Sequence, residues 1–316
     1  MNKQLFLSKI QSAQNIAILG HIRPDGDCVG SCIGAYNYIL DNYNDKNVVV
    51  YLEEIPHKFR FLNGAGQIRN TVDTSVYQLA ISLDCGARDR HGIFSEIFGN
   101  AEDTICIDHH RSNEGFGDYF CCDPNASSTC EILYRHLNSD CISKACAEAL
   151  YLGIVHDTGV FKYPSTSPET MKIAGEMISK GVSSQYIIDE TFYKVTYNQN
   201  KLTGEALMNA VLHLDGKVVS TCITMEMFKK YSTTKEDTDG IVDKLRVTDG
   251  VEVAIFIYQL TDHVYKFSLR SIEAVDVSKI SVSFGGGGHM RAAGFEAEGN
   301  VDDILERIIG MVKEQL

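Results

Sequence analysis

Short apolar runs alternate with amphipathic stretches through the first half of the chain. Four of these runs have the length and composition of buried strands, and they lie at residues 16–19, 48–52, 79–83 and 104–107. Stretches with helical spacing of apolar residues, at 31–40 and 128–137, stand between or after them. Strands that alternate with helices predict an α/β domain, with a mostly parallel sheet covered by helices on both faces.

The second half has a different pattern. Residues 203–214 read as a helix, and strand-like runs follow at 217–224, 251–260 and 264–272, the last two separated by a short polar turn typical of a hairpin. A helix near 275–283, a glycine run, a strand near 293–297 and a closing helix from Val301 complete the chain. This pattern predicts a second, smaller α/β domain. We expect domains at 1–185 and 211–316, joined by a linker at 186–210.

Length and composition agree with two ordinary globular domains. The chain has 316 residues, of which 44% are hydrophobic and 22% are charged. Its apolar runs are too short to cross a bilayer, and the N-terminal segment lacks the apolar centre of a signal peptide. The expected location is the cytoplasm, where the ten cysteines would be reduced thiols, and no membrane partner is expected.

The formal net charge of −13 narrows the range of partners. A protein that holds long nucleic acid gains much of its affinity by neutralising phosphates with Lys and Arg. The acidic balance therefore disfavours a long polynucleotide as substrate. A small anionic substrate remains compatible with it, because a local group of cations can outweigh the overall field.

Acidic residues and histidines follow three of these strand-like runs, at 16–19, 79–83 and 104–107, and a further apolar run, "LYLGIV" at 150–155, which we expect to end at the same edge. These residues are His21, Asp25 and Asp27; Asp84; Asp108, His109 and His110; and His156 with Asp157. Ligands bind beyond the carboxyl ends of the strands in open parallel sheets, so we expect these residues to meet at one edge of the sheet.

Each group alone has a structural explanation. Asp25 and Asp27 suit a turn that caps the following helix, and Asp84 suits the end of a strand. Asp108 with two histidines at a buried strand end is harder to explain in this way, because it would leave charge unpaired. The oxygen and nitrogen donors suit Mn²⁺, Mg²⁺, Co²⁺ or Zn²⁺. Two ions roughly 3.5–4 Å apart would relieve the repulsion among the carboxylates and promote phosphoryl transfer.

The four motifs resemble those of the DHH phosphoesterase superfamily in order and spacing. They read "HIRPDGD" from His21, Asp84, "DHH" from Asp108 and "DTG" from Asp157. In the second half, "SLRS" and "GGGGHMRAAGF" resemble the DHHA1 domain. The combination is similar to the group of bifunctional nano-RNases (oligoribonucleases) and 3'-phosphoadenosine 5'-phosphate phosphatases.

This resemblance implies an enzyme that hydrolyses oligonucleotides of a few residues to nucleoside 5'-monophosphates, with an active-site cleft between the two domains. It also implies two divalent ions, with Mn²⁺ expected first and Mg²⁺ or Co²⁺ as alternatives. One ion would be held by His21, Asp25 and Asp84, and the other by Asp27, Asp84, His109 and Asp157. Asp108 would orient the histidines, and His110 would contact the scissile phosphate or assist proton transfer.

The resemblance also assigns substrate binding to the second domain. The expected residues are Arg270, Ser271, Gly286, Gly287, Gly288 and His289. Short RNA or DNA oligonucleotides and nucleotides are the expected partners, and a homodimer is compatible with the sequence. His156 departs from the group, in which a small or polar residue often precedes the aspartate of the fourth motif.

Four alternatives to an oligonucleotide hydrolase remain open. A cyclic di-AMP phosphodiesterase would share nearly all of these motifs. A manganese-dependent inorganic pyrophosphatase would share only the first domain, and an exonuclease acting on long DNA would be longer and less acidic. A nucleotide sensor without catalysis would be expected to have lost ligands, whereas all of them are present.

Overall fold

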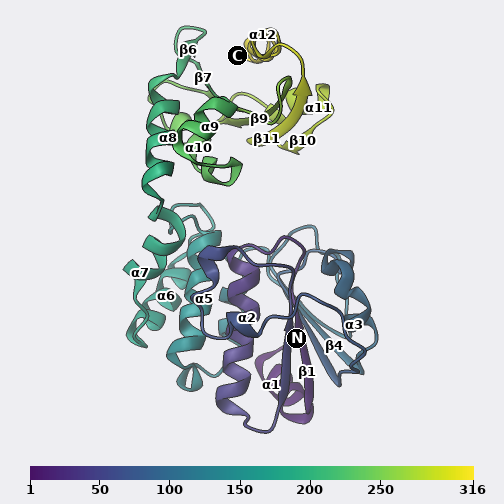
Figure 1. Ribbon diagram of the computed structural model, residues 1–316. Helices are drawn as coiled ribbons and strands as arrows, with labels where there is room; N and C mark the ends of the chain where they lie inside the picture. Colours follow the sequence, from purple (N-terminus) through teal and green to yellow (C-terminus); the bar gives the residue numbers. More distant parts are fainter. The chain divides into compact units, whose positions relative to one another are not determined.

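The computed structural model describes residues 1–316, and the chain divides into two compact units. The first unit is Met1–Lys194 and the second is Val195–Leu316. Each unit has a sheet of its own, drawn in Figure 1 among the purple to teal elements and among the green to yellow elements respectively.

The first unit is built on a five-stranded, wholly parallel sheet in the order β2-β1-β3-β4-β5. The strands are β1 (Asn15–Leu19), β2 (Asn47–Tyr51), β3 (Leu79–Leu83), β4 (Asp103–Asp108) and β5 (Tyr119–Cys122). The first four confirm the strands expected from the apolar runs. The short β5, with two cysteines and no flanking apolar run, was not expected.

Helices cover both faces of this sheet, as predicted. They are α1 (Lys3–Ser12), α2 (Gly26–Asn42), α3 (Ser95–Gly99), α4 (Thr129–His136), α5 (Lys144–Asp157), α6 (Pro168–Ser179) and α7 (Ser184–Ile188). Alternate strand residues face opposite ways. Ile16 and Ile18 therefore belong to the core under α2, α4 and α5, while Ala17 and Leu19 pack with α3 on the other face.

One apolar run was assigned to the wrong kind of element. The run "LYLGIV" before His156 is the last part of the helix α5 and not a strand that points into the site. Every residue of the helix from Ala149 to Val155 is buried, so the run shows no polar alternation that would distinguish a helix from a strand. The C-terminus of α5 nevertheless delivers Asp157 to the edge where the strands end.

The second unit contains a six-stranded mixed sheet in the order β10-β11-β9-β8-β7-β6. Its strands are β6 (Val211–His213), β7 (Val218–Ile223), β8 (Val253–Gln259), β9 (Val264–Ser271), β10 (Gly287–His289) and β11 (Ala292–Glu298). The expected hairpin is confirmed, since β8 and β9 pair antiparallel, and only β7 and β8 pair parallel. Part of the glycine run forms the edge strand β10, which was not expected.

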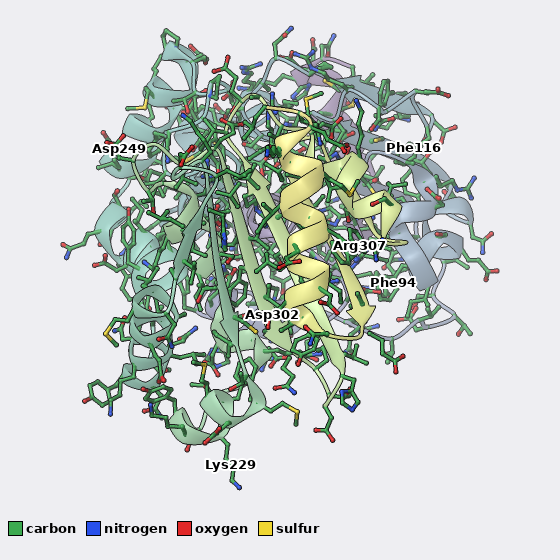
Figure 2. The ribbon with its side chains drawn as sticks, turned by 90° about the horizontal axis from the view of Figure 1, so that it is seen from above. Phe94, Phe116, Lys229, Asp249, Asp302 and Arg307 are labelled. Atoms are coloured by element: carbon green, nitrogen blue, oxygen red, sulfur yellow. The ribbon has the colours of Figure 1, made fainter.

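Two sets of helices cover the second sheet. The helices are α8 (Tyr197–Met208), α9 (Met225–Tyr231), α10 (Ile241–Arg246), α11 (Val277–Ser283) and α12 (Val301–Lys313). Buried residues of α8 and α10 pack on one face, and those of α11 and α12 pack on the other. Figure 2 shows α12 lying along the strands, and its Arg307 guanidinium sits 4.7 Å from the ring centre of Phe284.

The expected helix at 203–214 is only partly correct. The helix α8 ends at Met208, and Val211 to His213 form the edge strand β6, whose pairing with β7 overrides the local helical spacing. Much of the segment 186–210 is helical, since α7 and α8 enter it and the π-helix η5 (Asp189–Tyr193) lies inside it. No helix of the chain is long and apolar enough to span a membrane.

Candidate metal centre and nucleotide site

The four motifs meet at the carboxyl edge of the first sheet, as the sequence predicts. His21 follows β1, Asp84 follows β3, and His109 follows β4. The Nε2 atom of His21 lies 3.4 Å from Asp84 Oδ2, and the Nε2 atom of His109 lies 3.6 Å from Asp84 Oδ1. Asp84 is therefore the carboxylate shared by both histidines.

The N-terminus of α2 contributes two carboxylates with different surroundings. Asp25 is the N-cap and accepts hydrogen bonds from the backbone N–H groups of Asp27 and Cys28, both at 3.1 Å. Asp27 is fully buried, and its two oxygens accept from the backbone N–H groups of Thr129 and Cys130 at 2.6 and 3.0 Å. These donors form the first turn of α4, where the helix dipole stabilises a negative charge.

Asp84 is held in an unusual backbone conformation. Its φ is +57°, in the left-handed region that a non-glycine residue rarely adopts. The backbone N–H donates to the Ile107 carbonyl at 3.1 Å, and the Thr129 hydroxyl donates to Asp84 Oδ1 at 3.0 Å. The surrounding strands and α4 thus fix a buried carboxylate in a conformation that costs of order 1–3 kcal/mol.

His109 and Asp157 form the closest ion pair among the expected metal ligands, with His109 Nε2 3.1 Å from Asp157 Oδ2. The chain leaves α5 through a turn in which Gly159, Val160 and Phe161 all have φ between +55° and +62°. The Thr158 hydroxyl stabilises this turn, because it accepts the backbone N–H of Phe161 at 3.0 Å.

Asp108 holds His110, the histidine that follows His109 in the sequence. Its Oδ1 atom lies 2.7 Å from Nδ1 of His110, and its Oδ2 atom accepts from the side-chain amide of Asn113 at 2.7 Å. This arrangement places the Nδ1 proton of His110 on the Asp108 side and leaves Nε2 free for another partner. Asn113 was not identified from the sequence, since an asparagine three residues after a histidine has no distinctive pattern. Thr129 was missed for the same reason.

The pKa shifts reflect crowded negative charge. Burial raises the pKa of Asp27 well above its usual value, and the charges of Asp84 and Asp157 add to the rise. Burial acts to lower the pKa of His109, but the hydrogen bond to Asp157 and the charges of Asp27 and Asp84 raise it to about 10. Burial also opposes protonation of His21, yet its contacts with Asp25 and Asp84 raise its pKa.

These residues fit divalent metal ions. Three groups of side chains place their ligand atoms within 4.8 Å of one another, and these groups are Asp27, His109 and Asp157; Asp84, His109 and His110; and His21, Cys28 and Asp84. Burial and the charges of neighbouring carboxylates raise the pKa of Asp27 and of Asp157, and a cation between the carboxylates would reverse the effect of those charges. The Nδ1 atom of His21 lies 2.9 Å from the Ile22 carbonyl, which leaves its Nε2 lone pair for a metal. The acidic and histidine groups can therefore hold metal.

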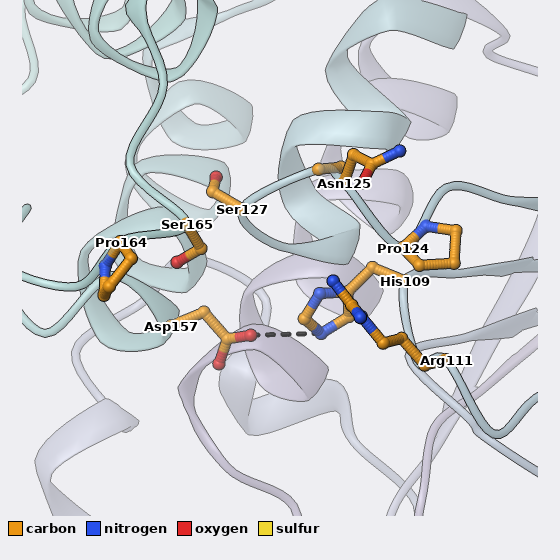
Figure 3. A pocket seen from close by; sticks show the side chains of 9 residues that line it. His109, Arg111, Pro124, Asn125, Ser127, Asp157, Pro164 and Ser165 are labelled. Atoms are coloured by element: carbon orange, nitrogen blue, oxygen red, sulfur yellow. Dashed lines mark ion pairs between the residues drawn. The ribbon is translucent and has the colours of Figure 1, made fainter. Parts of the chain in front are cut away.

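A pocket of about 450 Å³ opens beside the centre and includes His109 and Asp157 in its wall. The other lining residues are Arg111, Pro124, Asn125, Ala126, Ser127, Pro164 and Ser165. Figure 3 shows this wall, with the ion pair between His109 and Asp157 at its base. A second pocket of about 320 Å³ includes His21, Asp84, His110 and Arg90.

In the second unit, two of the expected substrate-binding residues share one face of the sheet. Arg270 of β9 pairs with Ala292 of β11, and Ala292 pairs with His289 of β10. Residues directly opposite each other on adjacent strands point to the same face, so Ala292 leaves space between the two larger side chains. Ser271 faces the other way, is 3% exposed and donates to the Met290 carbonyl at 3.4 Å.

Close approach of the backbone explains two of the expected glycines. A Cβ atom on Gly286 would lie 2.5 Å from the Gly294 carbonyl oxygen. A Cβ atom on Gly288 would lie 2.5 Å from the Cα of Ala293, and its φ is +140°. Gly287 has open space around it. Packing of β10 against β11 therefore requires glycine at 286 and 288.

Comparison with known families finds a match in each unit. Residues 15–154 match the DHH family, N-terminal domain, and residues 215–314 match the DHHA1 domain. The first match contains His21, Asp84 and the histidine pair that follows β4, and the second contains Arg270 and the glycine run.

Individual relatives resemble the chain over most of its length. A bifunctional oligoribonuclease and PAP phosphatase, NrnA of Bacillus subtilis, is 28% identical over 297 residues, which cover 92% of each chain. The cyclic-di-AMP phosphodiesterase PdeA of Listeria monocytogenes is 26% identical over 90% of this chain, but over only 45% of its own length. The crystal structure of an exopolyphosphatase-related protein from Bacteroides fragilis has a TM-score of 0.86 and 26% identity, covering 99% of this chain and 95% of its own.

Proposed function

The chain belongs to the DHH phosphoesterases that carry a DHHA1 domain, and on that premise we propose that it hydrolyses short oligonucleotides to nucleoside 5'-monophosphates. The proposal includes removal of the 3'-phosphate from 3'-phosphoadenosine 5'-phosphate, the second activity in the name of the Bacillus subtilis relative. That relative and this chain align over 92% of both lengths, so the match covers both domains.

The observation that carries the proposal is the position of Asp84. Its two oxygens face different histidines, His21 at 3.4 Å and His109 at 3.6 Å. A carboxylate in this position suits a bridge between two cations, and a pair of cations is the usual arrangement for in-line displacement at phosphorus.

Two divalent ions, with Mn²⁺ as the first candidate, fit the donor set. His21, Asp25 and Asp84 would hold one ion, and Asp27, Asp84, His109 and Asp157 would hold the other. Bound there, the ions supply Lewis-acid activation of water and of the phosphate.

The protein's own residues position the substrate and manage the proton. His110 donates Nδ1–H to Asp108, which keeps the imidazole oriented and raises its pKa. Its Nε2 atom would contact the scissile phosphate or protonate the leaving oxygen. Asn113 would support this action indirectly, because it holds the other oxygen of Asp108.

The second domain would select the substrate. Arg270 offers a planar guanidinium that suits bidentate contact with a phosphate, and His289 stands on the same sheet face with only Ala292 between them. We assign the terminal phosphate of the oligonucleotide to this pair. Gly286, Gly287 and Gly288 would let the backbone approach the nucleotide closely, whereas Ser271 would act through the backbone of Met290 that it hydrogen-bonds.

A cyclic dinucleotide phosphodiesterase is the second candidate. PdeA is 26% identical to the chain, which favours this activity over the pyrophosphatase and sensor alternatives. The chain spans less than half the length of PdeA, whereas it spans nearly all of NrnA. The linear activity therefore has the stronger support.

A substrate panel tests the proposal directly. The protein, freed of metal and then supplied with Mn²⁺, is incubated with a 5'-phosphorylated RNA dinucleotide, a 24-mer, cyclic di-AMP, 3'-phosphoadenosine 5'-phosphate and pyrophosphate. We expect rapid release of mononucleotides from the dinucleotide, an almost intact 24-mer and no turnover without metal. Faster cleavage of cyclic di-AMP or pyrophosphate than of the dinucleotide would refute the proposal.

A further inference from the structure

The pocket beside His109 and Asp157 contains a cation that the metal centre does not use. Asp157 is the only carboxylate in its wall, and it pairs with His109. Arg111 therefore has no acidic partner in the pocket. In Figure 3 its side chain extends over the pocket toward His109. In a chain of net charge −13, a guanidinium without a carboxylate beside a phosphoryl-transfer site suits an anionic ligand.

The rest of the wall has the chemistry of a small-ligand site. The Ser127 hydroxyl is already engaged by Glu131, which it contacts at 2.5 Å, but the side chains of Asn125 and Ser165 face the pocket without such a partner. Pro124 and Pro164 add rigid apolar surface. The volume of about 450 Å³ lies in the usual range for ligand pockets, and the wall is more polar than most, which suits a charged ligand with several hydrogen-bonding groups.

The walls of the pocket are held in place by the same elements that build the metal centre. Asn125 and Ser127 precede α4, whose first turn binds Asp27. Ser165 follows the left-handed turn after Asp157. The position of a ligand in the pocket is therefore fixed relative to the metal ligands, and the pocket lies wholly within the first unit.

We propose that this pocket binds the nucleoside 5'-monophosphate half of the substrate, with Arg111 on a phosphate oxygen and Asn125 and Ser165 on the nucleoside. The inference rests on the proposed function, for which it assigns a subsite. The second pocket, which contains Arg90 and Ser112 on the Asp84 side of the centre, leaves a separate path for the other half of a phosphodiester.

The two kinds of contact predict different effects of substitution. Arg111→Ala removes a contact to phosphate, so it should weaken every phosphate ester. Asn125→Ala and Ser165→Ala remove contacts to the nucleoside, so they should weaken nucleotides and spare bis(p-nitrophenyl) phosphate. Arg60→Ala is the matched control, because Arg60 pairs with Glu54 away from this pocket.

The test measures AMP binding to the Mn²⁺-loaded full chain by titration calorimetry, together with hydrolysis of the RNA dinucleotide and of bis(p-nitrophenyl) phosphate. We expect Arg111→Ala to raise the Kd for AMP by about ten- to hundredfold, Arg111→Lys to raise it less, and Arg60→Ala to leave it unchanged. Asn125→Ala should lower kcat/KM for the dinucleotide by about tenfold and leave that for bis(p-nitrophenyl) phosphate unchanged.

Unchanged AMP affinity in Arg111→Ala would overturn the inference, as would equal losses on both substrates in Asn125→Ala. The proposed function fails separately. If the unsubstituted protein binds AMP through Arg111 but leaves the dinucleotide intact, the nucleotide subsite stands and the hydrolase assignment falls. If it cleaves the dinucleotide while Arg111→Ala binds AMP normally, the hydrolase stands and the subsite falls.

Discussion

His109 Nε2 lies 3.1 Å from Asp157 Oδ2, although one residue follows a strand and the other ends a helix. The pair shows how the first unit assembles its centre from elements that are distant in sequence. The parallel strands bring His21, Asp84 and His109 to one edge, and the buried helix α5 brings Asp157 to the same edge.

Asp108→Asn should lower kcat by about 10- to 100-fold while changing KM little. The substitution keeps the shape of the side chain but removes the charge that holds the Nδ1 proton of His110, and loss of such an orienting partner typically has this size of effect. Steady-state kinetics on the RNA dinucleotide provide the measurement. Asp103→Asn is the control, because Asp103 pairs with Lys9 outside the site. Equal rates in the two variants would show that Asp108 does not position His110.

Thr129→Val should lower the affinity of the centre for Mn²⁺ without unfolding the chain. Valine has nearly the same shape as threonine, but it cannot donate the hydrogen bond at 3.0 Å to Asp84 Oδ1. We expect a loss of about tenfold in Mn²⁺ affinity, measured by equilibrium dialysis, because partners of metal ligands tune their basicity and orientation. Thr129→Ser keeps the hydroxyl and should restore affinity. Equal affinity in the valine and serine variants would contradict this role.

Arg270→Ala should raise KM for the 5'-phosphorylated dinucleotide by about tenfold or more and leave kcat largely intact, since it removes a contact to the terminal phosphate. Removing the 5'-phosphate from the substrate should abolish the difference between the variant and the unsubstituted protein. Arg246→Ala provides the control, because Arg246 ends α10 and pairs with Asp243 of the same helix. A large fall in kcat with unchanged KM would place Arg270 at the reacting phosphate instead.

His91 makes the stability of the first unit dependent on pH. Its ring is fully buried against Phe98 and Phe116, with Nε2 2.7 Å from the Ser82 hydroxyl. Burial and the charge of Arg88 lower the pKa of His91, the charge of Asp89 opposes the shift, and together they bring it to about 4. Because the folded state favours the neutral ring, unfolding takes up a proton between pH 6.5 and pH 4, and stability falls as pH falls through that interval.

The pKa of a histidine is near 6.5 in an unfolded chain. Titration of His91 should therefore lower the free energy of unfolding by about 3 kcal/mol between neutral pH and pH 4. Urea unfolding of the metal-free protein at pH 7 and at pH 4.5 measures it. The variant His91→Phe loses the hydrogen bond to Ser82 at both pH values. Its free energy of unfolding should nevertheless fall less between pH 7 and pH 4.5 than that of the unsubstituted protein. A fall of the same size in both proteins would contradict the assignment.

The strands could be predicted from sequence where burial gave them an apolar run with a clear end. The run that ends before Asp84 is an example, because all five residues of β3 are buried. The same property misled the prediction at α5, since a helix buried on nearly every side has no polar face to reveal its period. The strand β5 was not predicted because it has only four residues, all of them half-buried.

The candidate metal ligands could be selected from the sequence because few structural roles bring so many acids and histidines to strand ends. Asn113 and Thr129 could not, because their roles depend on which carboxylate the fold places beside them. The same holds for Arg111, since only the pocket shows that it lacks an acidic partner. The positive φ of Asp84 is likewise a property of the folded backbone.

The central claim is that one carboxylate, Asp84, joins two metal sites that hydrolyse short oligonucleotides. The most direct measurement determines bound Mn²⁺ per chain and dinucleotide hydrolysis in the same preparations of the unsubstituted protein, Asp84→Ala and the exposed control Asp41→Ala. We predict two ions and rapid release of mononucleotides in the unsubstituted protein and in the control. In Asp84→Ala we predict fewer bound ions and a rate lower by about 10³-fold, equivalent to a loss of roughly 4 kcal/mol. Full metal occupancy and near-normal hydrolysis in Asp84→Ala would contradict the account.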